Sequence, residues 1–119
     1  MNTLTIETFN NKTVYLPGEK ISGKAKWNIT GNSKKIELKL FWYTVGKGTM
    51  DLSVVDSMVL ENPLSSGSRD FSFTLPEIPF SFSGKLISVI WALELIAQGF
   101  NETGCLELTV SPSGKEITV

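Results

Sequence analysis

The stretches VYLPGEKISG (residues 14–23) and FSFTLPEIPFSFSG (residues 71–84) decide the fold of this chain. Each joins a proline-containing turn to a run in which apolar and polar residues alternate. In the first stretch, Pro17 fixes φ and Gly18 takes a backbone conformation that other residues avoid, so we expect a tight bend before a strand. In the second stretch, Pro76 ends a strand because proline donates no hydrogen bond to a ladder. Both stretches therefore predict half-buried β-strands bounded by turns.

The same alternation continues along most of the chain, and it is typical of strands with one buried face. It covers residues 3–7, 20–29, 36–42, 70–75 and 106–110. Segments rich in Gly, Pro, Asn and Ser separate these runs. Seven or eight strands punctuated in this way predict an all-β fold, an antiparallel immunoglobulin-like β-sandwich.

Two apolar segments, residues 50–60 and 86–97, fit a helix as well as a strand by the spacing of their residues. The second favours a strand, because its β-branched and aromatic side chains pack well on a sheet. An immunoglobulin-type sandwich pairs its second strand with its fifth and places its third beside its sixth. On this chain that order pairs 20–29 with 70–75 and 35–45 with 86–97, leaving 104–110 at an edge and Trp42 in the core.

Length and charge place the chain among ordinary globular proteins. Its 119 residues predict one domain, residues 1–119, and its net charge of −1 gives no indication of nucleic-acid binding. The first residues lack the basic head and apolar run of a signal peptide, and no stretch approaches the roughly 20 apolar residues that span a bilayer. Cys105 is the one cysteine, so no internal disulfide forms. We expect a cytoplasmic protein without a membrane span.

The chain contains no histidine, which removes the commonest general acid/base and the commonest zinc ligand. Ser-His-Asp and Cys-His catalytic arrangements are therefore excluded, and we expect no enzymatic activity, no metal and no cofactor. The turn Gly46-Lys47-Gly48 lacks the longer spacing of a phosphate-binding loop and predicts a hairpin. The carboxylates show no convergence in the pattern; they include Asp51, Asp56, Glu61 and Asp70.

Lys20, Lys24 and Lys26 point to the same face of one predicted strand. A solvated sheet face is the favoured interpretation, with Asp70 on the neighbouring strand pairing with one of these lysines. A weak anion-binding face is the alternative.

Apolar residues also occupy positions that ought to face water on two neighbouring strands. If Leu38, Leu40 and Trp42 point into the core, the residues between them point outward. An exposed patch of this kind usually marks an interface. The candidate partner-binding residues are Phe41, Tyr43, Val45, Ile90, Ala92 and Ile96. Two alternatives to an interface stay open: a β-bulge near Phe41 that turns these side chains inward, or a cover formed by a terminal segment or by the 50–60 hairpin.

The pattern Pro17-Gly18-Glu19 followed by Gly23, together with the run Ser81-Phe82-Ser83-Gly84-Lys85, resembles the amino-terminal domain of arrestin-like proteins. The resemblance is strongest to the α-arrestin and bacterial sporulation-control branches and extends from about Leu4 to Val110. It implies a fold that binds partners and performs no chemistry. Most members of the family join two such sandwiches, whereas we expect one here, and no Pro-Pro-x-Tyr motif is present.

Together these observations predict a non-catalytic protein–protein interaction module, an adaptor or scaffold, with self-association into a homo-oligomer as one form of its contact. The alternative is a sandwich that binds a small ligand or a carbohydrate. That alternative requires aromatic side chains around a concave site, and all three tryptophans, Trp27, Trp42 and Trp91, fall at positions predicted to point inward.

Overall fold

The computed structural model describes residues 2–46, 51–79, 81–83, 87–112 and 117–118. Apart from a short 3₁₀ turn, Phe9–Asn11, its regular elements are all β-strands. They are β1 Thr3–Thr8, β2 Val14–Tyr15, β3 Lys20–Asn28, β4 Lys35–Gly46, β5 Leu52–Glu61, β6 Ser66–Thr74, β7 Phe82–Ser83, β8 Ile87–Ala97, β9 Thr103–Val110 and β10 Ile117–Thr118. Both segments that fitted a helix by spacing form strands, β5 and β8, and the predicted all-β sandwich is confirmed.

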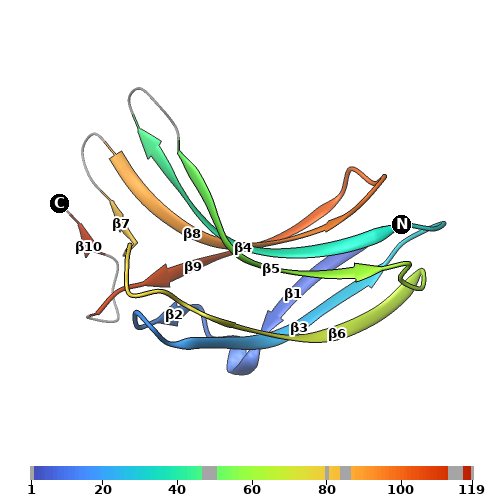
Figure 1. Ribbon diagram of the computed structural model, residues 1–119, viewed down its shortest axis with the longest axis horizontal. Coiled ribbons are helices and arrows are strands. Elements are labelled where there is room, and N and C mark those ends of the chain that lie inside the picture. The colour runs from blue at the N-terminus through green and yellow to red at the C-terminus, as the bar shows by residue number, and fades with distance from the viewer. Residues whose placement is uncertain (1, 47–50, 80, 84–86, 113–116, 119) are drawn as a thin grey trace.

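The strands form two sheets that pack face to face (Figure 1). The smaller sheet has the order β1-β3-β6, and the larger has the order β10-β7-β8-β4-β5, with β9 against β8 and β2 against β9. Pairing is antiparallel except between β2 and β9 and between β7 and β10. The predicted pairs are confirmed: β3 lies beside β6 with Lys24 opposite Asp70, and β4 lies beside β8 with Trp42 opposite Trp91.

The core consists of the inward-facing residues of both sheets. Trp91 and Leu93 of β8 are fully buried, as are Leu38 and Leu40 of β4 and Ile21 of β3. Burying a side chain of this size stabilises the fold by about 1.5–3 kcal/mol. The core therefore lies along the β4–β8 pair, the centre of the larger sheet.

Two glycines let β1 lie close to β3 in its own sheet and to β9 in the larger sheet. A Cβ atom at Gly23 of β3 would lie 2.1 Å from the carbonyl oxygen of Glu7, and one at Gly104 of β9 would lie 2.5 Å from the carbonyl oxygen of Leu4. Real Cβ atoms do not approach backbone this closely, so both positions require glycine. The Gly23 of the family-like pattern thus shapes the fold.

The larger sheet is strongly bent. In Figure 1 the left ends of β4 and β8 curve steeply away from the smaller sheet, so the outward face of the larger sheet lies on the inside of the bend. This curvature decides how the outward side chains of β4 and β8 pack.

Candidate functional site

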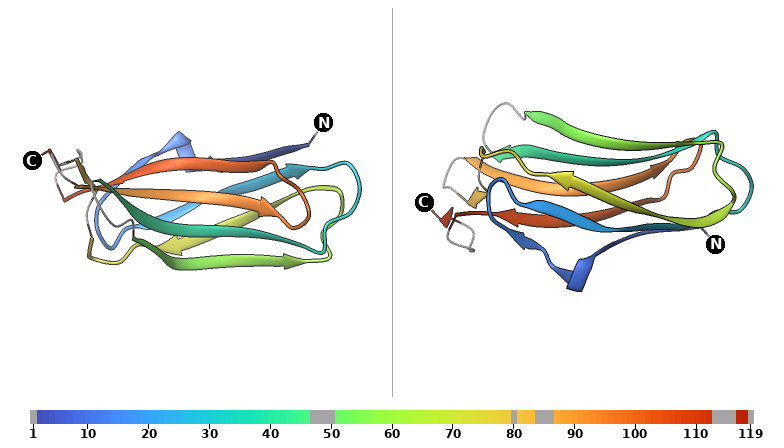
Figure 2. Two further views of the ribbon diagram at one scale, coloured as in Figure 1. Left: turned by 90° about the horizontal axis from the view of Figure 1, so that it is seen from above. Right: turned by 60° about the horizontal axis from the view of Figure 1, so that its bottom comes forward.

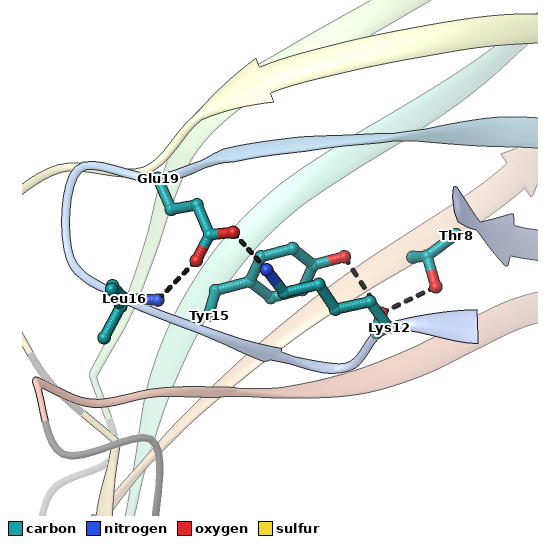
Figure 3. Close-up of polar contacts among 5 residues, drawn as sticks. All are labelled: Thr8, Lys12, Tyr15, Leu16 and Glu19. Carbon is teal, nitrogen blue, oxygen red and sulfur yellow. Dashed lines mark hydrogen bonds and ion pairs between the residues drawn. The ribbon is translucent and has the colours of Figure 1, made fainter. Parts of the chain in front are cut away.

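The Pro17-Gly18 turn is held by a cluster of internal polar contacts (Figure 3). The Glu19 carboxylate accepts a hydrogen bond from the backbone N–H of Leu16 at 2.8 Å and contacts the Lys12 ammonium. The Lys12 ammonium lies 5.0 Å from the centre of the Tyr15 ring. The hydrogen bond from Lys12, and then the one from the Leu16 N–H, lower the pKa of Glu19 below its usual value.

Tyr15 is buried beside this turn, and its hydroxyl donates a 2.9 Å hydrogen bond to the carbonyl oxygen of Lys12. The Thr8 hydroxyl donates to the same carbonyl at 2.6 Å. Burial raises the pKa of the Tyr15 hydroxyl. The polar groups of this cluster contact one another, so the cluster stabilises the turn.

The lysine face of the smaller sheet contains ion pairs to neighbouring strands. Lys24 lies 3.9 Å from the Asp70 carboxylate of β6, and Lys26 lies 3.1 Å from the Glu7 carboxylate of β1. The groups are about half exposed or more. This geometry is that of a solvated sheet face with surface pairs.

The register of β4 and β8 brings most of the candidate partner-binding residues together. Phe41 pairs with Ala92 and Tyr43 with Ile90, so their side chains share the outward face of the larger sheet. Val45 lies at the end of this group. Ile96 shares the face but is set apart from the group by the row in which Lys39 pairs with Glu94.

Strand β5 adds residues to this face that the sequence analysis missed. Leu52 pairs with Tyr43 and Val54 pairs with Phe41, so both lie on the outward face. Their side chains are 62% and 47% exposed. We name the combined surface the larger-sheet patch; its residues are Phe41, Tyr43, Val45, Leu52, Val54, Ile90 and Ala92.

The larger-sheet patch has a buried centre and an exposed rim. Phe41 is only 8% exposed and Ala92 only 2%, although neither belongs to the core between the sheets. The Phe41 and Tyr43 rings stack with their centres 5.9 Å apart. Val45 at the rim, in contrast, is 44% exposed.

Neither a bulge nor the β5 hairpin removes these apolar residues from the outward face. A register shift does occur at Leu40/Phe41, but only against β5, where Val55 is the extra residue. The register between β4 and β8 is unbroken, so Phe41 keeps its outward position. Residues 52–61 extend the sheet beside β4 instead of folding over it, and the described strands leave this face open in Figure 1. The hairpin turn at Gly46-Lys47-Gly48 lies mostly outside the described residues.

The one cysteine lies on the same outward face, opposite Glu94. Cys105 is exposed, yet partial burial of its thiol and then the charges of Glu94 and Glu107 raise its pKa. The thiolate fraction at neutral pH is therefore small, which argues against a nucleophilic role.

The three tryptophans lie in the core or pack against it. Trp27 and Trp91 are buried, and their indole N–H groups donate to the carbonyl oxygens of Leu64 at 2.8 Å and of Pro79 at 3.0 Å. Trp42 packs against the same core. Within the described ranges, no three His, Cys, Asp or Glu residues are close enough to hold a metal ion, and no helix could cross a membrane.

Comparison with known proteins supports the fold and leaves the function open. No protein-family model and no curated protein sequence matches this chain. Among solved structures, Spo0M, a sporulation control protein from Bacillus subtilis, matches 91% of this chain at a TM-score of 0.56 and 20% identity. The chain spans about half of Spo0M, 49% of its length. This likeness supports the arrestin-like fold expected from the Pro-Gly-Glu pattern.

A β-glucosidase from Listeria innocua also matches, over 98% of this chain and 16% of its own, at a TM-score of 0.51 and 12% identity. A sporulation control protein and part of a glycosidase thus share this architecture. Because one fold serves unrelated functions, the function must be argued from the surface of this chain.

Proposed function

We propose that this chain is a non-catalytic protein-interaction module, an adaptor or scaffold, that contacts its partner through the larger-sheet patch. The observation that carries this proposal is that the side chains at the rim of the patch are apolar and yet exposed to solvent. Leu52, Val54 and Val45 are large apolar side chains on an outward face, and they adjoin the Phe41–Tyr43 ring stack. Contiguous exposed apolar surface around a packed aromatic centre is typical of protein interfaces.

Absence of histidine from the sequence supports a role without catalysis. The high pKa of Cys105 supports it as well, because the one thiol of the chain is a poor nucleophile at neutral pH. The ligand-binding alternative receives no comparable support, since Trp27 and Trp91 lie in the core with their N–H groups already bonded.

The bend of the larger sheet favours a different protein over a second copy of this chain. Two surfaces that both lie inside a bend do not pack flush against each other, whereas a protruding segment of another protein fits such a surface (Figure 1). Self-association is the second form of the same contact. The likeness to Spo0M and the Pro17-to-Gly23 pattern favour the sporulation-control branch of the arrestin-like proteins as the functional setting.

Affinity capture with matched variants tests the proposal. The tagged chain and a patch variant, Tyr43→Ser with Leu52→Ser and Val54→Thr, are incubated with lysate of the native host, and bound proteins are quantified by mass spectrometry. We expect a stoichiometric partner that the patch variant loses while keeping its fold by circular dichroism. Equal recovery of every bound protein by both chains would contradict the proposal. Light scattering over a concentration series shows whether the bound species is a second copy.

A further inference from the structure

Strand β5 forms a free edge of the larger sheet, directly beside the larger-sheet patch. Figure 2 shows it as the outermost strand on one side of the sandwich. It pairs with β4 and, among the described strands, with no other. An edge strand of this length presents unpaired backbone groups to any extended segment that approaches it.

Hydrogen bonds at both ends of β5 identify the backbone groups that face away from β4. The N–H of Asn62 donates to the Lys34 carbonyl at 2.8 Å, and the N–H of Thr44 donates to the Asp51 carbonyl at 2.9 Å. Bonded and unbonded pairs alternate along an antiparallel ladder. Residues that alternate with the bonded ones therefore direct their backbone N–H and C=O groups to the free edge. The bulge at Val55 shifts this alternation by one residue between the two halves of β5. Those residues are Leu52, Val54, Ser57, Val59 and Glu61.

The middle of this edge is already occupied by the chain itself. Val55 is the extra residue of the bulge, and the N–H of Ser57 donates to the Asp56 carboxylate at 2.8 Å. Two segments of the edge therefore remain able to pair, one around Leu52–Val54 and one around Val59–Glu61. A strand that pairs with this edge would form backbone hydrogen bonds to both of these segments and would pass the bulge between them.

The side chains and charges of β5 define the segment that fits it. Leu52, Val54 and Val59 are exposed on the outward face. Residues 51–61 contain three acidic residues and no lysine or arginine. Two copies of residues 51–61 side by side would bring six carboxylates together, and like charges across a strand pair are destabilising. A basic strand would instead bring opposite charges together.

We propose that the free edge of β5 binds an extended segment of a partner protein in which apolar residues alternate with lysine or arginine. The segment adds to the larger sheet as a further strand, with its apolar residues covering Leu52, Val54 and Val59. Its basic residues then lie on the opposite face, beside Asp51 and Asp56. This inference rests on the proposed function, because the added strand widens the larger-sheet patch. It goes beyond that proposal by naming the edge and the chemistry of the partner.

Amide hydrogen exchange measured by NMR tests the inference on the whole chain. The probe is the peptide Lys-Val-Lys-Val-Thr-Val-Lys-Val-Lys-Val, and its matched control has glutamate at every lysine. With the lysine peptide we expect the amides of Leu52, Val54, Val59 and Glu61 to exchange at least about tenfold more slowly, while Leu60, already bonded to β4, changes little. We expect the glutamate peptide to bind at least about tenfold more weakly. Unchanged exchange, or equal binding of both peptides, would overturn the inference.

Protection of the same amides without peptide, growing with protein concentration, would also overturn it in favour of pairing between two copies. Val59→Pro removes an N–H that β4 does not use, so we expect this variant to fold and to lose peptide binding, whereas Val59→Thr binds normally. If Val59→Pro fails to fold, Val54→Lys repels the same peptide without removing a backbone donor.

The two proposals fail in distinguishable ways. If the natural partner is lost by the patch variant but retained by Val59→Pro, the edge inference is wrong and the proposed function stands. If both variants retain every bound protein, both proposals are wrong.

Discussion

The two outward faces of this sandwich differ in chemistry, because only the larger sheet carries a group of apolar side chains on its outward face, although the same alternation builds both sheets. Every outward position of the smaller sheet is polar and exposed; these are Thr3, Thr5, Glu7, Lys20, Ser22, Lys24, Lys26, Asn28, Ser66, Ser68, Asp70, Ser72 and Thr74. The larger sheet instead carries the aromatic and aliphatic larger-sheet patch. A sandwich needs only one apolar face on each sheet. The second apolar face is therefore more than a sandwich requires, and it is the basis of the proposed contact with a partner.

The largest effect is expected in the smaller sheet, where β1 and β6 leave no room for a side chain at Gly23. Gly23→Ala places a Cβ atom against the Glu7 carbonyl, so we expect the free energy of unfolding to fall by about 3 kcal/mol. Ser22→Ala, on the exposed neighbour, should change it by less than about 0.5 kcal/mol. Urea denaturation monitored by tryptophan fluorescence measures both. Similar values for the two variants would show that β1 moves away from β3 at little cost.

The next effect separates the centre of the larger-sheet patch from its rim. Phe41→Ala should lower the free energy of unfolding by about 2 kcal/mol, because Phe41 is nearly buried and stacks on Tyr43. Leu52→Ala should lower it by less than about 0.5 kcal/mol, because Leu52 is mostly exposed. Thermal and urea unfolding give both values. If Leu52→Ala costs as much as Phe41→Ala, the rim belongs to the folded core and is not available for a partner.

Phe41 and Leu52 also illustrate which features of the structure could be predicted from the sequence. Alternation predicted the strands of the sandwich and the buried face of each, because an error of one residue would expose the apolar residues of a strand. The β3–β6 and β4–β8 pairs were predicted from the strand order of immunoglobulin-type sandwiches. The outward position of Phe41 followed from the same alternation. The burial of Phe41 could not be predicted from alternation, because it depends on the bend of the sheet. Residues distant in sequence contribute to that bend.

Two further features were hidden from the sequence for specific reasons. The extra residue Val55 changes the phase of the alternation within β5, so Leu52 and Val54 were not recognised as outward-facing. The requirement for glycine at Gly23 comes from β1 lying across it, which is a tertiary contact.

A smaller effect concerns the polar turn that connects β2 to β3. Lys12 and the Leu16 N–H lower the pKa of Glu19 in the folded chain below its ordinary value of 4.5. A carboxylate with a lowered folded-state pKa adds stability above its unfolded pKa, and this stability is lost as pH falls through the folded pKa. Between about pH 6 and pH 3 we expect Glu19→Gln to lose less stability than the wild type. Parallel loss in both chains would show that the contacts of Glu19 do not contribute.

The smallest effect is expected on the lysine face. Lys24→Ala should change the free energy of unfolding by less than about 0.5 kcal/mol, because Lys24 and Asp70 form an exposed pair at 3.9 Å. The difference should shrink further in 1 M salt, at which the screening length is about 3 Å. Urea titrations at low and high salt check this. A large effect that survives high salt would give this face a structural role that its geometry does not suggest.

Covalent footprinting tests most directly the claim that the larger sheet, and not the smaller one, carries the contact. A photoactivated carbene labels the side chains of the chain alone and of the chain in its captured complex, and mass spectrometry compares labelling at each residue. We predict that labelling of Tyr43, Leu52 and Val54 falls in the complex while labelling of Glu7 and Lys26 stays the same. Protection of Glu7 and Lys26 with Leu52 and Val54 still labelled would contradict the account.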